Sequence, residues 1–197
     1  MTVRPVLACI LAAAPLAALA QGTPYNAPPL PDPASGFLCC NMRTDGSWIS
    51  DSNYFSIDKK TIPLGTPIKA LGYGRQRVYV ELPDGKQAIG NDYSRNLNLT
   101  AFAQRYIVAQ DPKQKLAGYP PRIRKAIETA HLVPGMTREQ VLMAVGYPIG
   151  SENPDLNAGV WRYWLSTWAE YQVVFGADNL VKEITADAQT RGFVLME

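Results

Sequence analysis

One short segment, residues 135–148, constrains this chain more than any other because both ends of a helix are encoded in it. Thr137 occupies the N-cap position, where its hydroxyl can accept a hydrogen bond from the backbone N–H of Gln140. The Gln140 side chain can reach back to the N-cap backbone, which completes a capping box. Met136 and Val141 have the spacing of a hydrophobic staple. The sequence therefore predicts a helix that begins directly after Thr137.

The same helix has one apolar stripe and a defined end. Val141, Leu142 and Val145 form the stripe. Gly146 suits the left-handed conformation that ends a helix, and Pro148 prevents its continuation. A helix of only about two to three turns does not persist alone in water. Other elements must therefore cover the stripe.

Two aromatic segments follow a polar, Gly- and Asn-rich stretch at residues 150–160, which is expected to be a loop. They read Trp161-Arg162-Tyr163-Trp164 and Tyr171-Gln172-Val173-Val174-Phe175. Alternation along a strand sends Trp161 and Tyr163 to one face and places Trp164 on the other. We expect the first face to cover the capped helix. The second face either packs on the N-terminal part or is exposed as an interaction patch.

This succession resembles the SmpA/OmlA (BamE-like) family of bacterial envelope proteins. The resemblance covers roughly residues 120–186 and rests on Gly-Met-Thr-x-x-Gln-Val, the Gly-x-Pro stop and the two aromatic segments. It implies two helices packed on a three-stranded antiparallel sheet, a shape shared with β-lactamase inhibitor proteins. It also implies action through binding surfaces that contact proteins of outer-membrane assembly. Arg162, Trp164 and Trp168 are the candidate partner-binding residues.

Residues 1–20 read as a secretory signal, because Arg4 precedes an apolar run that ends in Ala18-Leu19-Ala20. The run is too short to span a bilayer permanently, and we expect no transmembrane span in the mature chain. Cys9 comes before most of the run, whereas lipid attachment needs a cysteine after it. We therefore expect an exported protein that is periplasmic or peripherally associated with the outer membrane.

The remaining chain divides by composition into four stretches. Residues 21–36 contain five prolines and predict an extended, disordered tether. Residues 37–99 hold short strands and turns, residues 100–118 form a helical connector, and residues 119–190 form the BamE-like α+β domain. In the connector we expect a helix over residues 100–108 with Thr100 as its cap.

The β-rich stretch contains one clear hairpin. Val78, Val80 and Leu82 alternate with polar residues, and Asp84-Gly85 supplies the turn. Several short strands in about sixty residues favour a small, partly open barrel, and the segment is similar to bacterial SH3-like modules. The expected fold class is thus α+β: a small SH3-like β-barrel followed by a helix pair on a three-stranded antiparallel sheet.

The polar residues of the β-rich part suggest an alternative site. Trp48, Asp51, Asn53, Asp92 and Tyr93 could together bind peptidoglycan or a peptide. Asp51 and Asp92 could also act as acid and base if they are buried together. Asn, Asp and Ser equally serve to make turns through local hydrogen bonds. The sequence alone leaves these possibilities open.

The adjacent Cys39 and Cys40 are the only cysteines outside the expected signal. In an extended strand their side chains point to opposite faces, which opposes a bond between them. We expect one buried thiol and one partly exposed thiol. A cysteine hydrolase would require His131, the only histidine, which we place at the end of a helix.

The net charge and the small number of possible metal-binding side chains exclude further classes of function. The formal net charge is +2, and no basic stripe is interleaved with stacking aromatics, so we expect no nucleic-acid partner. One histidine and one cysteine pair offer too few ligands for a metal site, and no cofactor motif is recognised. We therefore interpret the chain as a non-enzymatic interaction or envelope-assembly factor with an envelope protein as its partner.

Overall fold

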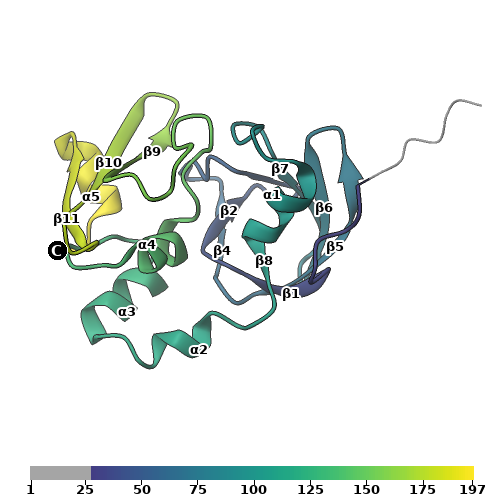
Figure 1. Ribbon diagram of the computed structural model, residues 1–197, viewed down its shortest axis with the longest axis horizontal. Helices are drawn as coiled ribbons and strands as arrows, with labels where there is room; N and C mark the ends of the chain where they lie inside the picture. The colour runs from purple at the N-terminus through teal and green to yellow at the C-terminus, as the bar shows by residue number, and fades with distance from the viewer. Residues whose placement is uncertain (1–27) are drawn as a thin grey trace, which may run out of the picture.

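The computed structural model describes residues 28–197. The expected signal and residues 21–27 of the expected tether lie outside this range. The described chain is a mixed α+β protein with a curled six-stranded sheet, a three-stranded antiparallel sheet and five helices (Figure 1). The predicted α+β class is thereby confirmed. No helix in the described part of the chain is both long and apolar enough to cross a membrane.

The first part contains eight strands and one helix. They are β1 (Ser35–Leu38), β2 (Met42–Thr44), β3 (Trp48–Ser50), β4 (Lys60–Ile62), β5 (Pro67–Gly74), β6 (Arg77–Leu82), β7 (Gly85–Gly90), α1 (Leu99–Tyr106) and β8 (Ile107–Val108). The large sheet has the order β3-β7-β6-β5-β1-β8, and β2 pairs with β4 separately. The β3–β7 pair is parallel and the others are antiparallel. The predicted hairpin is present as β6–β7, with Leu82 opposite Gly85.

Of the segment expected to connect the two parts, residues 102–107 contribute to the first core, whereas Leu116 belongs to the second. The helix begins at Leu99 rather than at Thr100, because the Asn98 side chain caps it by accepting a hydrogen bond from Ala101 N at 2.8 Å. Residues 107–108 are not helical as expected; they form β8 and pair with β1. Gly36 permits this approach, since a Cβ atom there would lie 2.2 Å from the carbonyl oxygen of Val108.

The last residues of the expected tether pack on the folded part of the chain. The carbonyl oxygen of Pro29 accepts hydrogen bonds from the Tyr73 hydroxyl at 3.1 Å and from Thr100 Oγ1 at 2.8 Å. Pro31 is buried, and β1 already begins at Ser35. The prediction of an extended tether up to residue 36 is therefore wrong for residues 29–36, because backbone carbonyls there find donors on β5 and α1.

The second part consists of four helices and three strands. They are α2 (Lys113–Leu116), α3 (Pro121–Glu128), α4 (Arg138–Val145), β9 (Val160–Ser166), β10 (Ala169–Phe175), β11 (Val181–Ala186) and α5 (Ala188–Val194). The sheet order is β11-β10-β9, all antiparallel. The predicted capping box of α4 is present, with Thr137 and Gln140 bonded in both directions. Gly146 has a positive φ of 83°, as its position after the helix requires.

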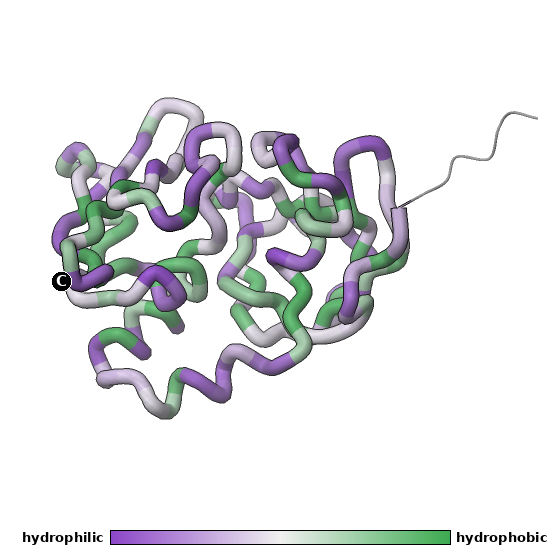
Figure 2. Tube along the Cα trace, in the orientation of Figure 1, coloured by the Kyte–Doolittle hydropathy of each residue, from purple (hydrophilic) through white to green (hydrophobic). Residues whose placement is uncertain are grey.

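Each part has its own hydrophobic core. In the second, Val141 of α4 is fully buried with Trp161 of β9 and Val173 of β10, which face each other in the sheet. Leu142 is partly buried and packs against the same core. Figure 2 shows hydrophobic stretches along the strands of both parts, with hydrophilic residues frequent in the connecting turns. The aromatic strands thus cover the capped helix, as predicted.

A buried polar junction joins the two parts. The Asn41 side chain donates to the carbonyl oxygens of Ile127 at 2.6 Å and Ala144 at 3.1 Å. The Asn53 side chain donates to the carbonyl oxygens of Val145 at 2.9 Å and Asn41 at 3.1 Å. Two amides from the first part therefore satisfy carbonyl groups at the C-terminal ends of α3 and α4.

Candidate functional site

The outer face of β9 and β10 carries two of the three predicted partner-binding residues. Trp161 and Tyr163 point into the core and are 1% and 5% exposed, whereas Arg162 is exposed and Trp164 is half-buried. On this outer face Trp164 lies opposite Glu170 and Arg162 opposite Gln172. The predicted alternation of β9 is confirmed, and Arg162 on the outer face is exposed.

Glu152 orients this face from the loop before β9. Its Oε2 atom accepts a hydrogen bond from Trp164 Nε1 at 2.9 Å and lies 3.8 Å from Arg162 Nε. The same guanidinium nitrogen lies 3.7 Å from Glu170 Oε2. Such exposed ion pairs add little stability. Together with the Trp164–Glu152 hydrogen bond, these contacts place the Arg162 and Trp164 side chains around Glu152.

The loop before β9 also closes the free edge of this strand. Asn153 Oδ1 accepts a hydrogen bond from Arg162 N at 2.8 Å, and Asn153 Nδ2 donates to Arg162 O at 2.9 Å. The amide side chain thereby replaces a neighbouring strand. A shallow hollow of about 320 Å³ remains beside it, lined by Glu152, Asn153, Val160, Arg162 and Gln172.

Trp168 lies in the turn between β9 and β10 and is 93% exposed. Phe55 of the first part lies near the end of β9, because its backbone N–H donates a hydrogen bond to the carbonyl oxygen of Leu165 at 2.8 Å. The Phe55 ring lies 5.1 Å from that of Phe193 in α5, and both rings are more than a third exposed. Ile57, on the same loop, is 92% exposed. Phe55 and Phe193 thus form an exposed aromatic pair next to the end of β9.

Residues of the alternative site lie near one another, since a Cβ atom at Gly90 would lie 2.1 Å from the Trp48 ring and 2.8 Å from Asp92 Oδ2, but two of the five are buried. Asn53 is 7% exposed and holds the junction described above. Asp51 is 1% exposed, and its carboxylate accepts hydrogen bonds from the backbone N–H groups of Asp92 at 3.3 Å and Tyr93 at 3.0 Å. Both side chains bond to backbone groups of segments distant in the sequence, so turns made through local hydrogen bonds do not account for them.

The two carboxyl groups of this region are neighbours with different surroundings. Burial raises the pKa of Asp51 above its ordinary value, and hydrogen bonds from the Tyr93 backbone offset part of that rise. Asp92 is half-buried, with Oδ2 3.4 Å from Ser50 Oγ. Because the Asp51 side chain is enclosed, a substrate cannot reach it as it would reach a general acid or base.

Trp48 and Tyr93 have different aromatic and cationic neighbours. Tyr93 is 42% exposed and its ring is 6.3 Å from that of Tyr54. Trp48 instead lines a hollow of about 560 Å³ on the large sheet, where Ala88 lies between Trp48 and Tyr79 in register. The Arg77 guanidinium lies 4.9 Å from the centre of the Trp48 ring.

Cys39 and Cys40 form a disulfide bond, so the expectation that their side chains would diverge is wrong. The reason is local geometry: β1 ends at Leu38, and both cysteines lie in a bend rather than in an extended strand. The exposure of the pair is as expected, since Cys40 is fully buried and Cys39 is half-buried.

The disulfide and His131 are not arranged as a hydrolase site. Cys39 lines a cavity to which His131 does not contribute, and a disulfide sulfur carries no thiolate nucleophile. His131 follows α3, and its Nδ1 atom lies 3.0 Å from Thr129 Oγ1. No group of three or more His, Cys, Asp or Glu side chains within residues 28–197 is positioned to hold a metal ion.

Several residues of the exposed surface were not predicted from the sequence. Phe55, Ile57 and Phe193 belong to short segments without periodicity, and only their apolar character in otherwise polar surroundings marks them. Glu152 and Asn153 were assigned only to a polar loop. Their roles depend on where that loop passes the edge of β9, which the sequence does not specify.

Comparison with protein-family models, with curated proteins and with solved structures finds no match for this chain.

Proposed function

We propose that this protein is a non-catalytic interaction factor of the bacterial cell envelope, which binds a partner protein through Arg162, Trp164 and Trp168. The observation that carries the proposal is the 93% exposure of Trp168 beside an outer sheet face with an oriented tryptophan and arginine. Tryptophan and arginine are the residues most enriched among those that dominate protein–protein binding energy. The motif resemblance to SmpA/OmlA proteins supports an envelope-assembly role and an exported location.

The geometry of the face favours binding without large rearrangement. Glu152 and Glu170 already hold the Arg162 guanidinium, and Glu152 holds the Trp164 indole. Side chains that are ordered before association lose less conformational entropy when the partner binds. A partner would therefore find an oriented tryptophan and arginine on the sheet and one accessible tryptophan, Trp168, on the turn.

The arrangement of the other candidate groups supports a non-enzymatic role. Asp51 is enclosed by the turn that it stabilises. Cys39 is bonded to Cys40. Each enzyme hypothesis thus lacks one of the two groups that it required, because Asp51 is enclosed and Cys39 carries no thiolate.

Site-specific photo-crosslinking in intact cells tests the proposal. A photoreactive phenylalanine analogue at position 168 should give one discrete adduct with an envelope protein. The same analogue at Asp84, an exposed position in the β6–β7 turn, serves as the matched control and should not give it. Arg162→Ala should weaken the adduct without changing protein abundance. Identical adducts from positions 168 and 84, or none from 168, would exclude this face as the binding surface.

One observation favours a second candidate function, in which the first part is an SH3-like module that binds peptidoglycan or a peptide. The hollow beside Trp48 combines two aromatic rings with Arg77 and Lys86. Wild-type protein should then sediment with purified sacculi, and Trp48→Ala and Tyr79→Ala should remain in the supernatant. If Trp168→Ala is lost from the sacculi while Trp48→Ala is retained, the second candidate is wrong.

A further inference from the structure

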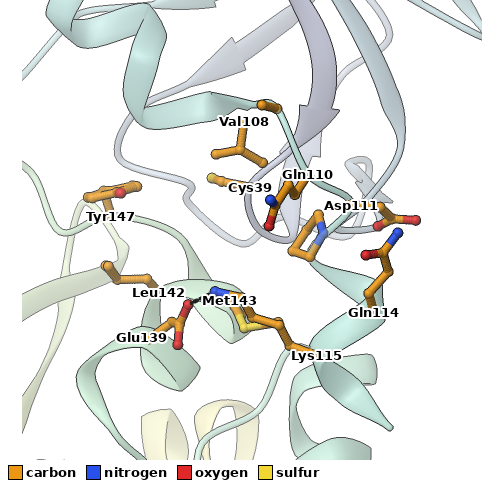
Figure 3. Close-up of a pocket in the computed structure, with 12 residues that line it drawn as sticks. Cys39, Val108, Gln110, Asp111, Gln114, Lys115, Glu139, Leu142, Met143 and Tyr147 are labelled. Atoms are coloured by element: carbon orange, nitrogen blue, oxygen red, sulfur yellow. Dashed lines mark hydrogen bonds and ion pairs between the residues drawn. The ribbon is translucent and has the colours of Figure 1, made fainter. Parts of the chain in front are cut away.

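A cavity of about 400 Å³ lies where the end of β1 faces α4 (Figure 3). Its apolar lining is partly or fully buried and comprises Cys39, Val108, Leu142, Met143 and Tyr147. Exposed polar side chains contribute the remainder, among them Gln110, Gln114 and the ion-paired Lys115 and Glu139. The cavity is therefore an apolar chamber with a polar rim, large enough for a small organic molecule.

The disulfide presents only one of its two sulfur atoms to this cavity. Cys39 lines the cavity and is half-buried, whereas Cys40 is fully buried in the first core. Thiol–disulfide exchange requires that the attacking thiolate reach one sulfur atom of the bond. The surroundings thus assign the attacked sulfur to Cys39 and the leaving sulfur to Cys40.

We propose that the Cys39–Cys40 disulfide is a thiol-exchange site that a small dithiol reduces through this cavity. A thiolate of the dithiol attacks Cys39 Sγ and forms a mixed disulfide, while the bond to Cys40 Sγ breaks and Cys40 leaves as a thiolate that takes up a proton. The second thiol of the reductant then attacks its own sulfur in the mixed disulfide and releases Cys39. The products are one cyclic disulfide of the reductant and two protein thiols, so two electrons pass to the protein.

The flanking backbone keeps the two thiols together after reduction. The backbone N–H of Cys39 donates to Tyr106 O at 2.9 Å, and that of Asn41 donates to Met143 O at 3.1 Å. The pair is therefore held on both sides by elements that do not depend on the disulfide. Two adjacent thiols held in this way form a bidentate site for a soft ion or for a trivalent arsenical.

Thiol counting on the folded protein tests the proposal. In the full chain with Cys9→Ser, only Cys39 and Cys40 remain. A chromogenic disulfide reagent should detect no thiol before reduction and two thiols per chain after dithiothreitol treatment and desalting. Phenylarsine oxide should then block both. Free thiols before reduction, or release only after a denaturant is added, would overturn the proposal.

Variants that block the cavity test whether the reductant must enter it to reach the disulfide. Gln110→Trp places a large ring on the exposed rim and should slow thiol release several-fold. Gln104→Trp, at an exposed position of α1 that does not line the cavity, should release thiols at the wild-type rate. Both variants should yield two thiols after unfolding. Equal rates for the two variants would show that the reductant does not use this cavity.

Single-cysteine variants test which sulfur is attacked. In Cys40→Ser the remaining Cys39 thiol should react with iodoacetamide in the folded state. In Cys39→Ser the buried Cys40 thiol should react several-fold more slowly in the folded state, with circular dichroism used to establish that both variants are folded. Comparable alkylation rates in the two folded variants would contradict the assigned direction of attack.

Discussion

The side-chain amide of Asn41 donates to the carbonyl oxygen of Ile127 at 2.6 Å, although 86 positions separate the two residues. The same amide group donates to Ala144 O at 3.1 Å and accepts from Leu64 N at 2.9 Å. One side chain thus completes the backbone hydrogen bonding of α3, of α4 and of the loop after β4. Without this amide, Ala144 O and Leu64 N would lose their partner without access to water, whereas Ile127 O also accepts a hydrogen bond from Ala130 N at 3.1 Å.

Asn41→Leu should therefore destabilise the protein strongly. Leaving Ala144 O and Leu64 N buried and unpaired, at about 1–3 kcal/mol each, should lower the free energy of unfolding by about 2 kcal/mol or more. Urea titration monitored by circular dichroism measures this change. Asn157→Ala, at an exposed position, should remain within about 0.5 kcal/mol of wild type. Similar values for both variants would show that the junction contributes little.

The two parts should unfold as one cooperative unit, because the buried junction links them. Hydrogen exchange in β6 of the first part and β10 of the second should report similar free energies of opening. Asn41→Leu should reduce both by a comparable amount. Loss of protection in only one part would show that the parts are energetically independent.

Two tryptophans of neighbouring segments should behave oppositely on truncation. Trp161 is 1% exposed, so Trp161→Ala should cost about 3–5 kcal/mol of unfolding free energy. Trp168 is 93% exposed, and Trp168→Ala should change stability by less than about 0.5 kcal/mol. Thermal and urea unfolding measure both. A large loss of stability in Trp168→Ala would mean that its effect on partner binding could not be separated from unfolding.

Asp51 should make stability depend on pH in the direction opposite to most paired carboxylates. Burial raises its pKa in the folded state, so the unfolded chain releases the proton first. Stability then falls as pH rises above the ordinary pKa of about 4. Asp51→Asn removes this pH-dependent contribution. The unfolding free energy of the variant minus that of wild type should therefore increase as the pH rises above about 4.

The pKa of Asp45 is shifted in the direction opposite to that of Asp51. Hydrogen bonds from the Ser47 and Trp48 backbone lower the pKa of Asp45. Its contribution to stability is present above its ordinary pKa and is lost as pH falls. The unfolding free energy of Asp45→Asn relative to wild type should therefore decrease with rising pH. Parallel slopes for the two variants, measured by urea unfolding from about pH 3 to 7, would contradict both assignments.

The capping box of α4 should act as a unit. Thr137→Ala should lower the unfolding free energy by about 1 kcal/mol because Gln140 N loses its acceptor. Gln140→Ala removes the reciprocal bond to Thr137 N. Since the two bonds share both residues, the double variant should cost less than the sum of the single variants. Strict additivity in urea unfolding would indicate that the two bonds form independently.

What the sequence predicted correctly depends on interactions between near neighbours. The cap of α4, the β6–β7 hairpin and the alternation of Trp161, Arg162 and Tyr163 all involve residues within a few positions of each other. Side-chain periodicity was sufficient to assign the inner and outer faces of β9. It also led to the prediction that α4 is covered by the aromatic strands.

What could not be predicted depends on contacts between distant segments. Asn53 was assigned to a ligand site because its polarity is visible in the sequence, but the carbonyl of Val145 to which it donates is 92 positions away. Similarly, Ile107 continues an apolar pattern that suits a helix, yet its pairing with Leu38 makes it a strand residue. Even the Cys39–Cys40 bond follows from a bend whose position is set by neighbouring elements.

The junction also determines the order in which a growing polypeptide can mature. Synthesis delivers Asn41 86 residues before Ile127 and 103 residues before Ala144. Until those carbonyls emerge, its amide is better solvated by water than enclosed, and β1 likewise lacks the β8 neighbour that follows α1. Before α3 and α4 have been synthesised, the first part can bury its own apolar core but cannot complete the junction. The contact between the two parts should therefore form only after α4 has emerged.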